Sequence, residues 1–213
     1  MELFTIGHSN HPIETFIGLL EQHQITAIAD VRSHPYSRRF PQFSQSELQT
    51  TLKQARIHYV FLGRELGARS EDLSCYDSLG KAVYERIAGT DSFTEGLQRV
   101  LNGLKTYRIA LMCAEKDPIT CHRTILVCRN LRQFNLKINH ILSEGQLESQ
   151  AELEERLLAK FNKKNKHQEA IQLSLFEPHL PEEQQEISLE EAYSKQGYEI
   201  AFKKPEQKNE TRS

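Results

Sequence analysis

Five side chains able to take part in chemistry lie close together in the sequence: Cys113, Glu115, Cys121, His122 and Arg123. The apolar run at 109–112 predicts a buried strand that ends in a thiol, and residues 120–134 predict a helix. In a parallel sheet, ligands bind at the carboxyl ends of the strands, where such a loop begins. The loop between this strand and this helix is therefore the candidate site.

Cys121 is the candidate nucleophile of this loop, because the amino end of a helix favours the thiolate form. His122 and Arg123 place two more basic groups in the first helical turn, where they call for a nearby anion. That anion is a substrate phosphate or carboxylate, or the side chain of Asp30 or Glu115. In the alternative interpretation, Cys121 is a small buried residue and Arg123 pairs with Asp30.

Cys113 ends a buried strand, so it is either a core residue or a partner of Cys121. Seven residues separate the two thiols, which is neither a zinc-ribbon nor a thioredoxin spacing, and we predict no metal site from it. The two could still meet across the loop, as a redox pair or as metal ligands with His8 or His122. His8 could also act as an acid or base, or simply end the first strand.

The order of elements predicts an α/β fold with a mainly parallel sheet and helices on both faces, a Rossmann-like three-layer arrangement over residues 1–145. Strands are expected at 3–6, 26–29, 58–62, 109–112 and 137–142, and helices at 12–22, 44–55, 81–88, 92–104 and 120–134. Residues 70–80 resemble a surface insertion in which Cys75 is incidental, whereas Cys128 lies on the core face of its helix.

Polar residues follow each predicted strand, and parallel strands bring them to one edge of the sheet: His8, Asp30, Arg32, Arg64, Cys113 and Glu115. Several arginines surround this edge with aromatic residues between them: Arg32, Arg38, Arg39, Arg64, Arg69 and Arg123, with Tyr36, Phe40 and Phe43. Guanidinium groups and aromatic rings suit phosphate binding and base stacking. The alternative is a solvated loop with scattered charge.

Charge and apolar content limit the classes of function. Residues 1–145 carry 17 Lys and Arg against 15 Asp and Glu, whereas residues 146–213 carry 10 against 14, which argues against general electrostatic coating of DNA. No apolar run approaches the roughly 20 residues that span a bilayer. Four cysteines make no disulfide framework, so we expect a cytoplasmic protein without membrane association.

The carboxyl-terminal third has a different composition. Residues 146–170 predict an amphipathic helix and a linker, and residues 171–213 predict a flexible acidic tail with apolar clusters at 172–178 and 192–202. The sequence QLSLF at 172–176 resembles the short peptide by which bacterial replication and repair proteins bind the DNA sliding clamp. Its Gln172 would form hydrogen bonds, and Leu173, Leu175 and Phe176 would enter an apolar pocket.

Four segments together resemble domain of unknown function 488. They are TIGHSN at 5–10, DVRSHPYSRRFPQF at 30–43, the stretch from Tyr59 through LGRELGAR at 62–69, and LMCAEKDPITCHR at 111–123. The resemblance extends over about residues 1–145 and implies the α/β domain. It also implies a characteristic polar set: His8, Asp30, Arg32, Cys113, Glu115, Cys121, His122 and Arg123. It does not indicate a reaction, and the cofactor stays unknown.

The leading hypothesis is a protein that acts on nucleic acid or a nucleotide, brought to sites of replication or repair by the clamp peptide. As a Cys-dependent hydrolase or transferase it would use Cys121 to attack or coordinate, and His8 or His122 to move protons. Arg32 and Arg123 would hold a phosphate, and Asp30 or Glu115 would orient the other groups. The alternatives are a non-catalytic adaptor that binds an anionic ligand, and a sulfur or redox enzyme that uses Cys113 and Cys121.

Overall fold

A six-stranded sheet forms the centre of the part of the chain that the structure describes. The structure is a computed structural model that describes the backbone of residues 1–173 and 186–205, and the side chains of residues 1–162 and 186–205. The strand order is β3-β2-β4-β1-β5-β6, in which the first five are parallel and β6 is antiparallel to β5. The strands are β1 Glu2–Gly7, β2 Ala27–Asp30, β3 His58–Phe61, β4 Ile109–Cys113, β5 Lys137–Ile141 and β6 Leu147–Ser149.

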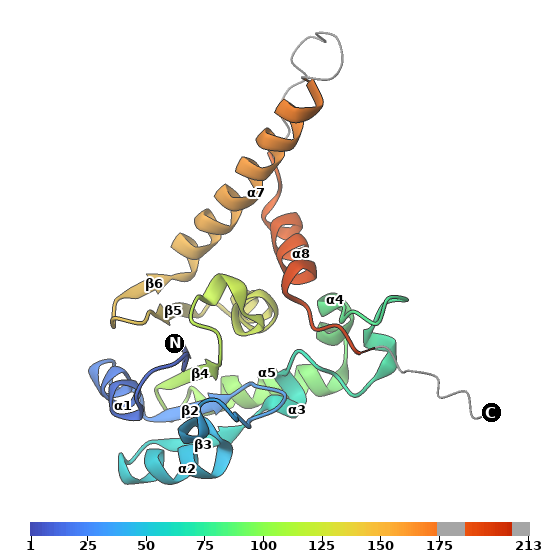
Figure 1. The fold of residues 1–213 in the computed structure, drawn as a ribbon. Coiled ribbons are helices and arrows are strands. Elements are labelled where there is room, and N and C mark those ends of the chain that lie inside the picture. The colour runs from blue at the N-terminus through green and yellow to red at the C-terminus, as the bar shows by residue number, and fades with distance from the viewer. Residues whose placement is uncertain (174–185, 206–213) are drawn as a thin grey trace, which may run out of the picture.

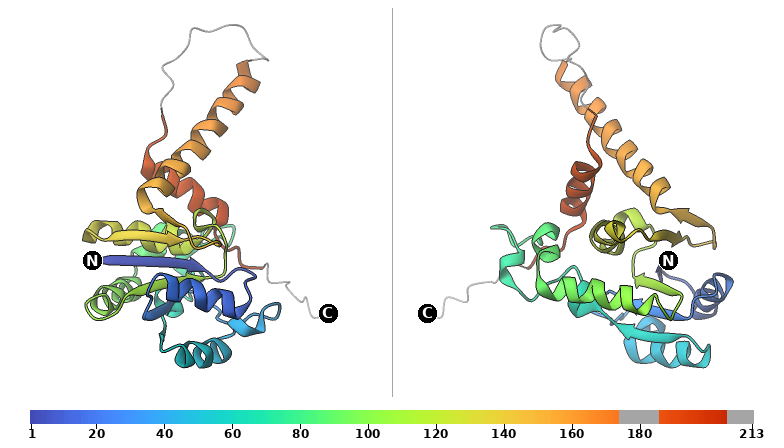
Figure 2. Two further views of the ribbon diagram at one scale, coloured as in Figure 1. Left: turned by 90° about the vertical axis from the view of Figure 1, so that its left-hand side faces the viewer. Right: turned by 180° about the vertical axis from the view of Figure 1, so that it is seen from behind.

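Helices cover both faces of the sheet, which confirms the predicted three-layer α/β fold (Figures 1 and 2). Along β1, Phe4 and Ile6 pack against one set of helices, whereas Leu3 belongs to the opposite core. Alternation of side chains along a strand produces this division. The first face carries α1 Ile13–Gln22 and α2 Gln45–Gln54; the second carries α3 Gly63–Leu66, α4 Tyr84–Ala88 and α5 Asp91–Gly103.

The chain after β4 departs from the single helix expected at 120–134. A 3₁₀ turn at Pro118–Thr120 is followed by a π-helical turn at Arg123–Cys128, then α6 Arg129–Leu131 and a 3₁₀ turn at Arg132–Phe134. All six residues of the π-helical turn are buried. A helical segment that is buried on every side shows no polar stripe, so the sequence indicated a helix but not its type.

The segment at 70–80 lies mostly at the surface, as expected, but Cys75 and Tyr76 anchor it to the core. The side chain of Cys75 is fully buried in the core, and Tyr76 pairs with Ala82 in a short antiparallel bridge. Because Lys81 also forms a bridge, with Lys203, helix α4 begins at Tyr84 rather than at residue 81. Cys128 is fully buried, as predicted.

The tail expected to be flexible from residue 171 contains an ordered helix within residues 186–205. Helix α8 spans Leu189–Ile200, its first turn is capped by Ser188, and Tyr193 is fully buried. Helix α7 spans Gln150–Leu173 and continues through the expected linker, beside α8 (Figure 1). Burying one apolar stripe of α8 on the domain stabilises a segment whose overall composition is polar.

The predicted clamp-binding peptide, at 172–176, lies where the described residues of α7 end. Gln172 and Leu173 end α7 without described side chains, and Leu175 and Phe176 lie outside the described residues. Within the described ranges, none of the helices is both long enough and apolar enough to cross a bilayer.

Candidate functional site

The carboxyl ends of β1, β2 and β4 meet at one edge of the sheet. The amide of His8 donates to the carbonyl of Cys113 at 2.9 Å, and the amide of Val31 donates to that of Met112 at 3.1 Å. The polar residues predicted at this edge therefore come together, except Arg64. They form two groups, because Asp30 lies on the face of α1 and α2 and Cys113 on the opposite face.

Arg32 organises the first group. Its Nε and Nη2 donate to the two carboxylate oxygens of Asp30 at 2.9 and 2.6 Å, which is a buried bidentate ion pair. Its Nη1 donates to the carbonyl of Phe43 at 2.8 Å and lies 3.3 Å from Nε2 of His8. The hydroxyl of Tyr59 donates to Asp30 as well, at 2.8 Å. Arg32 is thus held in one orientation, with its charge balanced by Asp30.

His8 is neutral in this environment. Burial and the adjacent Arg32 charge lower the pKa of His8 to about 4. Its Nδ1 lies 2.9 Å from the carbonyl of Ser9, so that nitrogen carries the proton, and Nε2 accepts from Arg32. The ring stacks on Phe43 with 4.3 Å between centroids. His8 therefore faces the edge as an uncharged imidazole.

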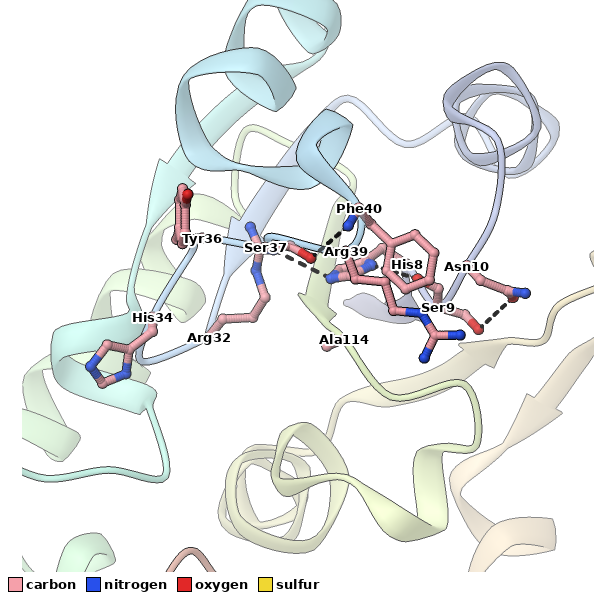
Figure 3. A pocket seen from close by; sticks show the side chains of 10 residues that line it. All are labelled: His8, Ser9, Asn10, Arg32, His34, Tyr36, Ser37, Arg39, Phe40 and Ala114. Atoms are coloured by element: carbon pink, nitrogen blue, oxygen red, sulfur yellow. Dashed lines mark hydrogen bonds between the residues drawn. The ribbon is translucent and has the colours of Figure 1, made fainter. Parts of the chain in front are cut away.

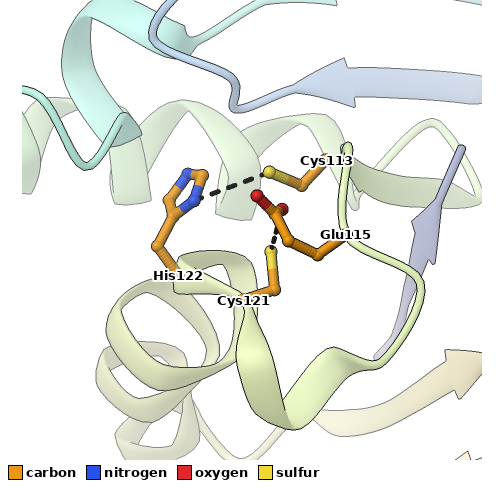
Figure 4. A group of neighbouring side chains, drawn as sticks. All are labelled: Cys113, Glu115, Cys121 and His122. Atoms are coloured by element: carbon orange, nitrogen blue, oxygen red, sulfur yellow. Dashed lines mark hydrogen bonds between the residues drawn. The ribbon is translucent and has the colours of Figure 1, made fainter. Parts of the chain in front are cut away.

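The second group joins both thiols with a carboxyl group and an imidazole (Figure 4). One donor atom from each of Cys113, Glu115, Cys121 and His122 lies within 4.8 Å of all the others. Sγ of Cys113 is 3.5 Å from Nδ1 of His122, and Sγ of Cys121 is 3.0 Å from Oε2 of Glu115. Nε2 of His122 lies 2.9 Å from the carbonyl of Val31 and must donate to it, which turns Nδ1 toward the sulfur atoms.

The negative charge of this cluster concentrates on Cys121. Burial alone would raise the pKa of its thiol, but the hydrogen bond from Cys113 and the charges of Arg123 and His122 hold that pKa well below its usual range. Burial and the hydrogen bond to Cys121 raise the pKa of Cys113. Burial and the charge of Cys121 raise the pKa of Glu115. Cys121 is 1% exposed, so its thiolate is shielded from solvent.

The side chain of Arg123 holds the loop between the two cysteines in place. Arg123 is fully buried, and its guanidinium group donates to the carbonyls of Glu115 at 2.8 Å and Lys116 at 3.4 Å. Its Nε reaches the hydroxyl of Thr5 at 3.4 Å. Arg123 does not pair with Asp30, because the two side chains lie on opposite faces of the sheet. Gly7 allows the loop to approach β1, since a Cβ there would lie 1.9 Å from the carbonyl oxygen of Glu115.

Two cavities open at this edge and share Arg32, His34 and Ala114 in their walls. The larger, about 510 Å³, has a basic and aromatic lining that includes Arg39 and Tyr36, which lie on opposite sides of it (Figure 3). We call it the anion cavity. The smaller, about 350 Å³, is lined by Cys113, Glu115 and His122 among others, and we call it the thiol cavity.

The remaining predicted residues have different positions. Arg39 lines the anion cavity, Arg38 lies in a neighbouring depression with Pro41 and Ser44, and Arg64 is exposed in α3 outside both cavities. Gln172, Leu173, Leu175 and Phe176 have no described side chains and stay a prediction.

Sequence reasoning missed the wall that the carboxyl-terminal segment gives to the thiol cavity. Ile200 and Phe202 line it together with Tyr84, and the guanidinium group of Arg69 lies 4.3 Å from the ring centre of Phe202. The apolar cluster at 192–202 was the available signal, because Ala192, Gln196 and Ile200 recur at the spacing of one helical face.

The family model described as domain of unknown function DUF488 matches residues 12–129, which is more than half of the chain. The match begins after β1. It includes Arg39 and Tyr36 of the anion cavity as well as Cys113, Glu115, Cys121 and His122. Searches among curated proteins and among solved structures found no match.

Proposed function

We propose the function from the site itself, because the chain belongs to the family of domain of unknown function DUF488, whose description assigns no reaction. The protein binds a nucleotide or a nucleic-acid strand by its phosphate groups in the anion cavity. It acts on this ligand with the groups of the adjoining thiol cavity. The shared wall formed by Arg32, His34 and Ala114 carries the proposal, since it places the two cavities side by side.

The lining of the anion cavity supports a phosphate-bearing aromatic ligand. Arg39 is exposed and makes no ion pair among the described residues, so its charge is available to an anion. It lies over the ring of Phe40, 5.4 Å from its centre, and Tyr36 is 70% exposed. Exposed aromatic rings beside an arginine provide stacking surfaces for bases and a partner for phosphate.

Binding of fluorescein-labelled single-stranded oligonucleotides and of a fluorescent nucleotide, followed by anisotropy, tests this proposal. We expect Arg39→Glu to weaken binding at least tenfold, and Tyr36→Ala to weaken it by the about 1–3 kcal/mol that stacking of one base contributes. Arg64→Glu is the matched control, because it makes the same change of charge outside both cavities. Equal effects of Arg39→Glu and Arg64→Glu would show that the cavity is not the binding site.

The adaptor hypothesis differs from the enzyme hypothesis in what the thiol cavity contributes. Cys113 lines that cavity, whereas the anion cavity has no sulfur in its wall. For an enzyme, Cys113→Ser abolishes turnover of the bound nucleotide or strand and leaves its binding constant within about twofold. For an adaptor, the wild-type protein binds the same ligand and turns none over.

Recruitment by the sliding clamp is a separate proposal that rests on QLSLF at 172–176. The peptide lies in sequence between α7 and α8, whose described residues pack together: Lys160 of α7 pairs with Glu199 of α8 at 2.6 Å, and Asn162 accepts from the amide of Ile187. Replacing Leu175 and Phe176 by Ala should abolish capture by a bacterial sliding clamp. Replacing Ser174 by Ala is the control.

A further inference from the structure

We propose that Cys113, Glu115, Cys121 and His122 together bind one zinc ion. This adds a cofactor to the proposed function, although metal binding can be measured whether or not the nucleotide proposal holds. Zinc in proteins is bound by thiolate, imidazole and carboxylate groups in tetrahedral sites, and these four residues offer two, one and one of them.

The separations between the donor atoms fit a tetrahedral ion. Zinc bonds of about 2.3 Å to sulfur and about 2.0–2.2 Å to nitrogen or oxygen place the corners of a tetrahedron about 3.3–3.8 Å apart. The four donor atoms already lie within 4.8 Å of one another. The side chains of Cys113, Cys121 and Glu115 converge on a common point with the ring of His122 (Figure 4), so small rotations complete the site.

His122 is prepared as a ligand by its outer hydrogen bond. Metal-binding histidines almost always donate their second ring N–H to a carbonyl or carboxylate group, which fixes the tautomer and directs the lone pair. The carbonyl of Val31, 2.9 Å from Nε2, has this role here. Nδ1 of His122 faces Cys113 at 3.5 Å.

The buried charge of Arg123 suits the net charge of a zinc-bound cluster. Its guanidinium group is fully buried, yet within the described residues it forms no salt bridge and donates only to carbonyl and hydroxyl oxygens. A buried cation requires negative charge nearby. Two thiolates, one carboxylate and a divalent ion sum to one negative charge, which Arg123 balances from directly beneath the loop.

The loop that joins the ligands is rigid enough to hold a metal site. The side chain of Asp117 accepts from the amide of Ile119 at 3.1 Å, and Arg156 binds the same carboxylate at 2.8 Å. Gln196 of α8 donates to the carbonyl of Ile119 at 2.8 Å. Preorganisation by supporting hydrogen bonds is what a precise metal site requires.

Glu115 is the ligand closest to solvent. Its carboxyl group is shielded inside the cluster, 3.0 Å from Sγ of Cys121, but the residue as a whole is exposed and lines the thiol cavity, whereas both cysteines and His122 are buried. A carboxylate in this position is the ligand that a substrate oxygen or water would replace. A zinc ion with such a position polarises a phosphoryl or carbonyl oxygen and lowers the pKa of bound water toward about 7.

Metal content and cobalt spectroscopy of the full-length chain test the proposal. After zinc loading and desalting, we expect one zinc per chain by mass spectrometry of the metal. Cobalt substitution should give thiolate-to-cobalt charge-transfer absorption together with the strong d–d bands of a tetrahedral site. Cys121→Ser and His122→Ala should lose the retained metal, and Cys113→Ser should lose most of the charge-transfer intensity.

Cys128→Ser is the matched control, because Cys128 is buried five residues from Arg123 and outside the cluster. Glu115→Gln changes an exposed position and tests the site even if a cysteine variant fails to fold. This variant should bind cobalt at least tenfold more weakly than the wild type. A wild-type chain that retains no zinc overturns the proposal, as does a cobalt spectrum without thiolate absorption. Arg39→Glu should retain full metal, which separates this result from the nucleotide test.

Discussion

At the scale of single residues, the site depends on groups buried beneath its loop. Arg123 lies beneath the loop between Cys113 and Cys121 and connects that loop to Thr5 of β1. Sequence reasoning placed it among the phosphate-binding residues because arginines near strand ends commonly have that role. Its complete burial instead gives it the role of a positioning residue, whose charge also stabilises the Cys121 thiolate.

Gly7 determines how closely the same loop approaches the sheet. A methyl group at this position would lie 1.9 Å from the carbonyl oxygen of Glu115. The methyl group is fixed to the main chain and the oxygen belongs to it, so neither can rotate away. We expect Gly7→Ala to lower the free energy of unfolding by about 3 kcal/mol, the upper range for an overpacked core. Urea denaturation followed by circular dichroism measures it.

Gly18→Ala is the control for this prediction. Gly18 lies within α1, where an added Cβ meets nothing within 4 Å. Replacing glycine by alanine in an open helical position stabilises a protein by about 0.5–1 kcal/mol. The two variants should therefore shift the urea midpoint in opposite directions, and a shift in the same direction would contradict the steric role of Gly7.

At the scale of elements, periodicity predicted the sheet because its strands are short apolar runs with polar residues directly after them. The residues from Ile109 to Cys113 are all buried, which is typical of a parallel strand covered on both faces. The same pattern could not reveal that His8 and Cys113 belong to different cavities. That division depends on strand register, since Gly7 rather than His8 stands opposite Cys113.

Helix α8 was missed because composition averages over a segment, whereas packing depends on individual positions. Residues 171–213 are polar overall, yet Tyr193 is fully buried and its hydroxyl donates to Glu154 at 2.8 Å. Four well-placed residues on one face are enough when a domain surface is available to receive them. Tertiary contacts of this kind are invisible to a local window.

Gln196 connects α8 to the candidate site. It is 1% exposed, its amide donates to the carbonyl of Ile119, and Lys160 donates to its oxygen. Replacing Gln196 by Ala leaves a buried carbonyl without its partner, at a cost of about 1–3 kcal/mol. Thermal unfolding should show the loss. Gln98→Ala, on an exposed position of α5, should leave the midpoint unchanged, and equal midpoints for the two variants would contradict a supporting role for α8.

At the scale of the whole molecule, one buried hydrogen-bonded chain joins the first strand to the carboxyl-terminal helix. The hydroxyl of Thr5 meets Nδ1 of His140 in β5 at 2.8 Å, and Nε2 of His140 lies 3.1 Å from the side-chain oxygen of Gln150 at the start of α7. Gln150 in turn donates to the hydroxyl of Tyr193 in α8 at 2.6 Å. Arg123, bound to Thr5, extends this chain to the site loop.

His140 makes that chain sensitive to acid. Burial and the nearby Arg123 charge lower the pKa of His140 from 6.5 to about 3, so the folded protein holds the ring neutral. The unfolded chain binds a proton below pH 6.5, and the folded one does not until about pH 3, so stability is full above pH 6.5 and falls as the pH decreases through this window. Between pH 6.5 and pH 5, the loss from this one group amounts to about 2 kcal/mol.

His140→Gln isolates this contribution, because glutamine does not titrate. The variant should be less stable than the wild type at pH 7.5, where its hydrogen bonds are poorer. Its disadvantage should shrink by about 2 kcal/mol at pH 5, since only the wild type must then exclude a proton. Urea denaturation at both pH values measures the double difference, in which other titrating groups cancel. Parallel losses in the two proteins would mean that His140 already carries its proton in the folded state, and the neutral chain from Thr5 to Tyr193 would have to be redrawn around a buried imidazolium.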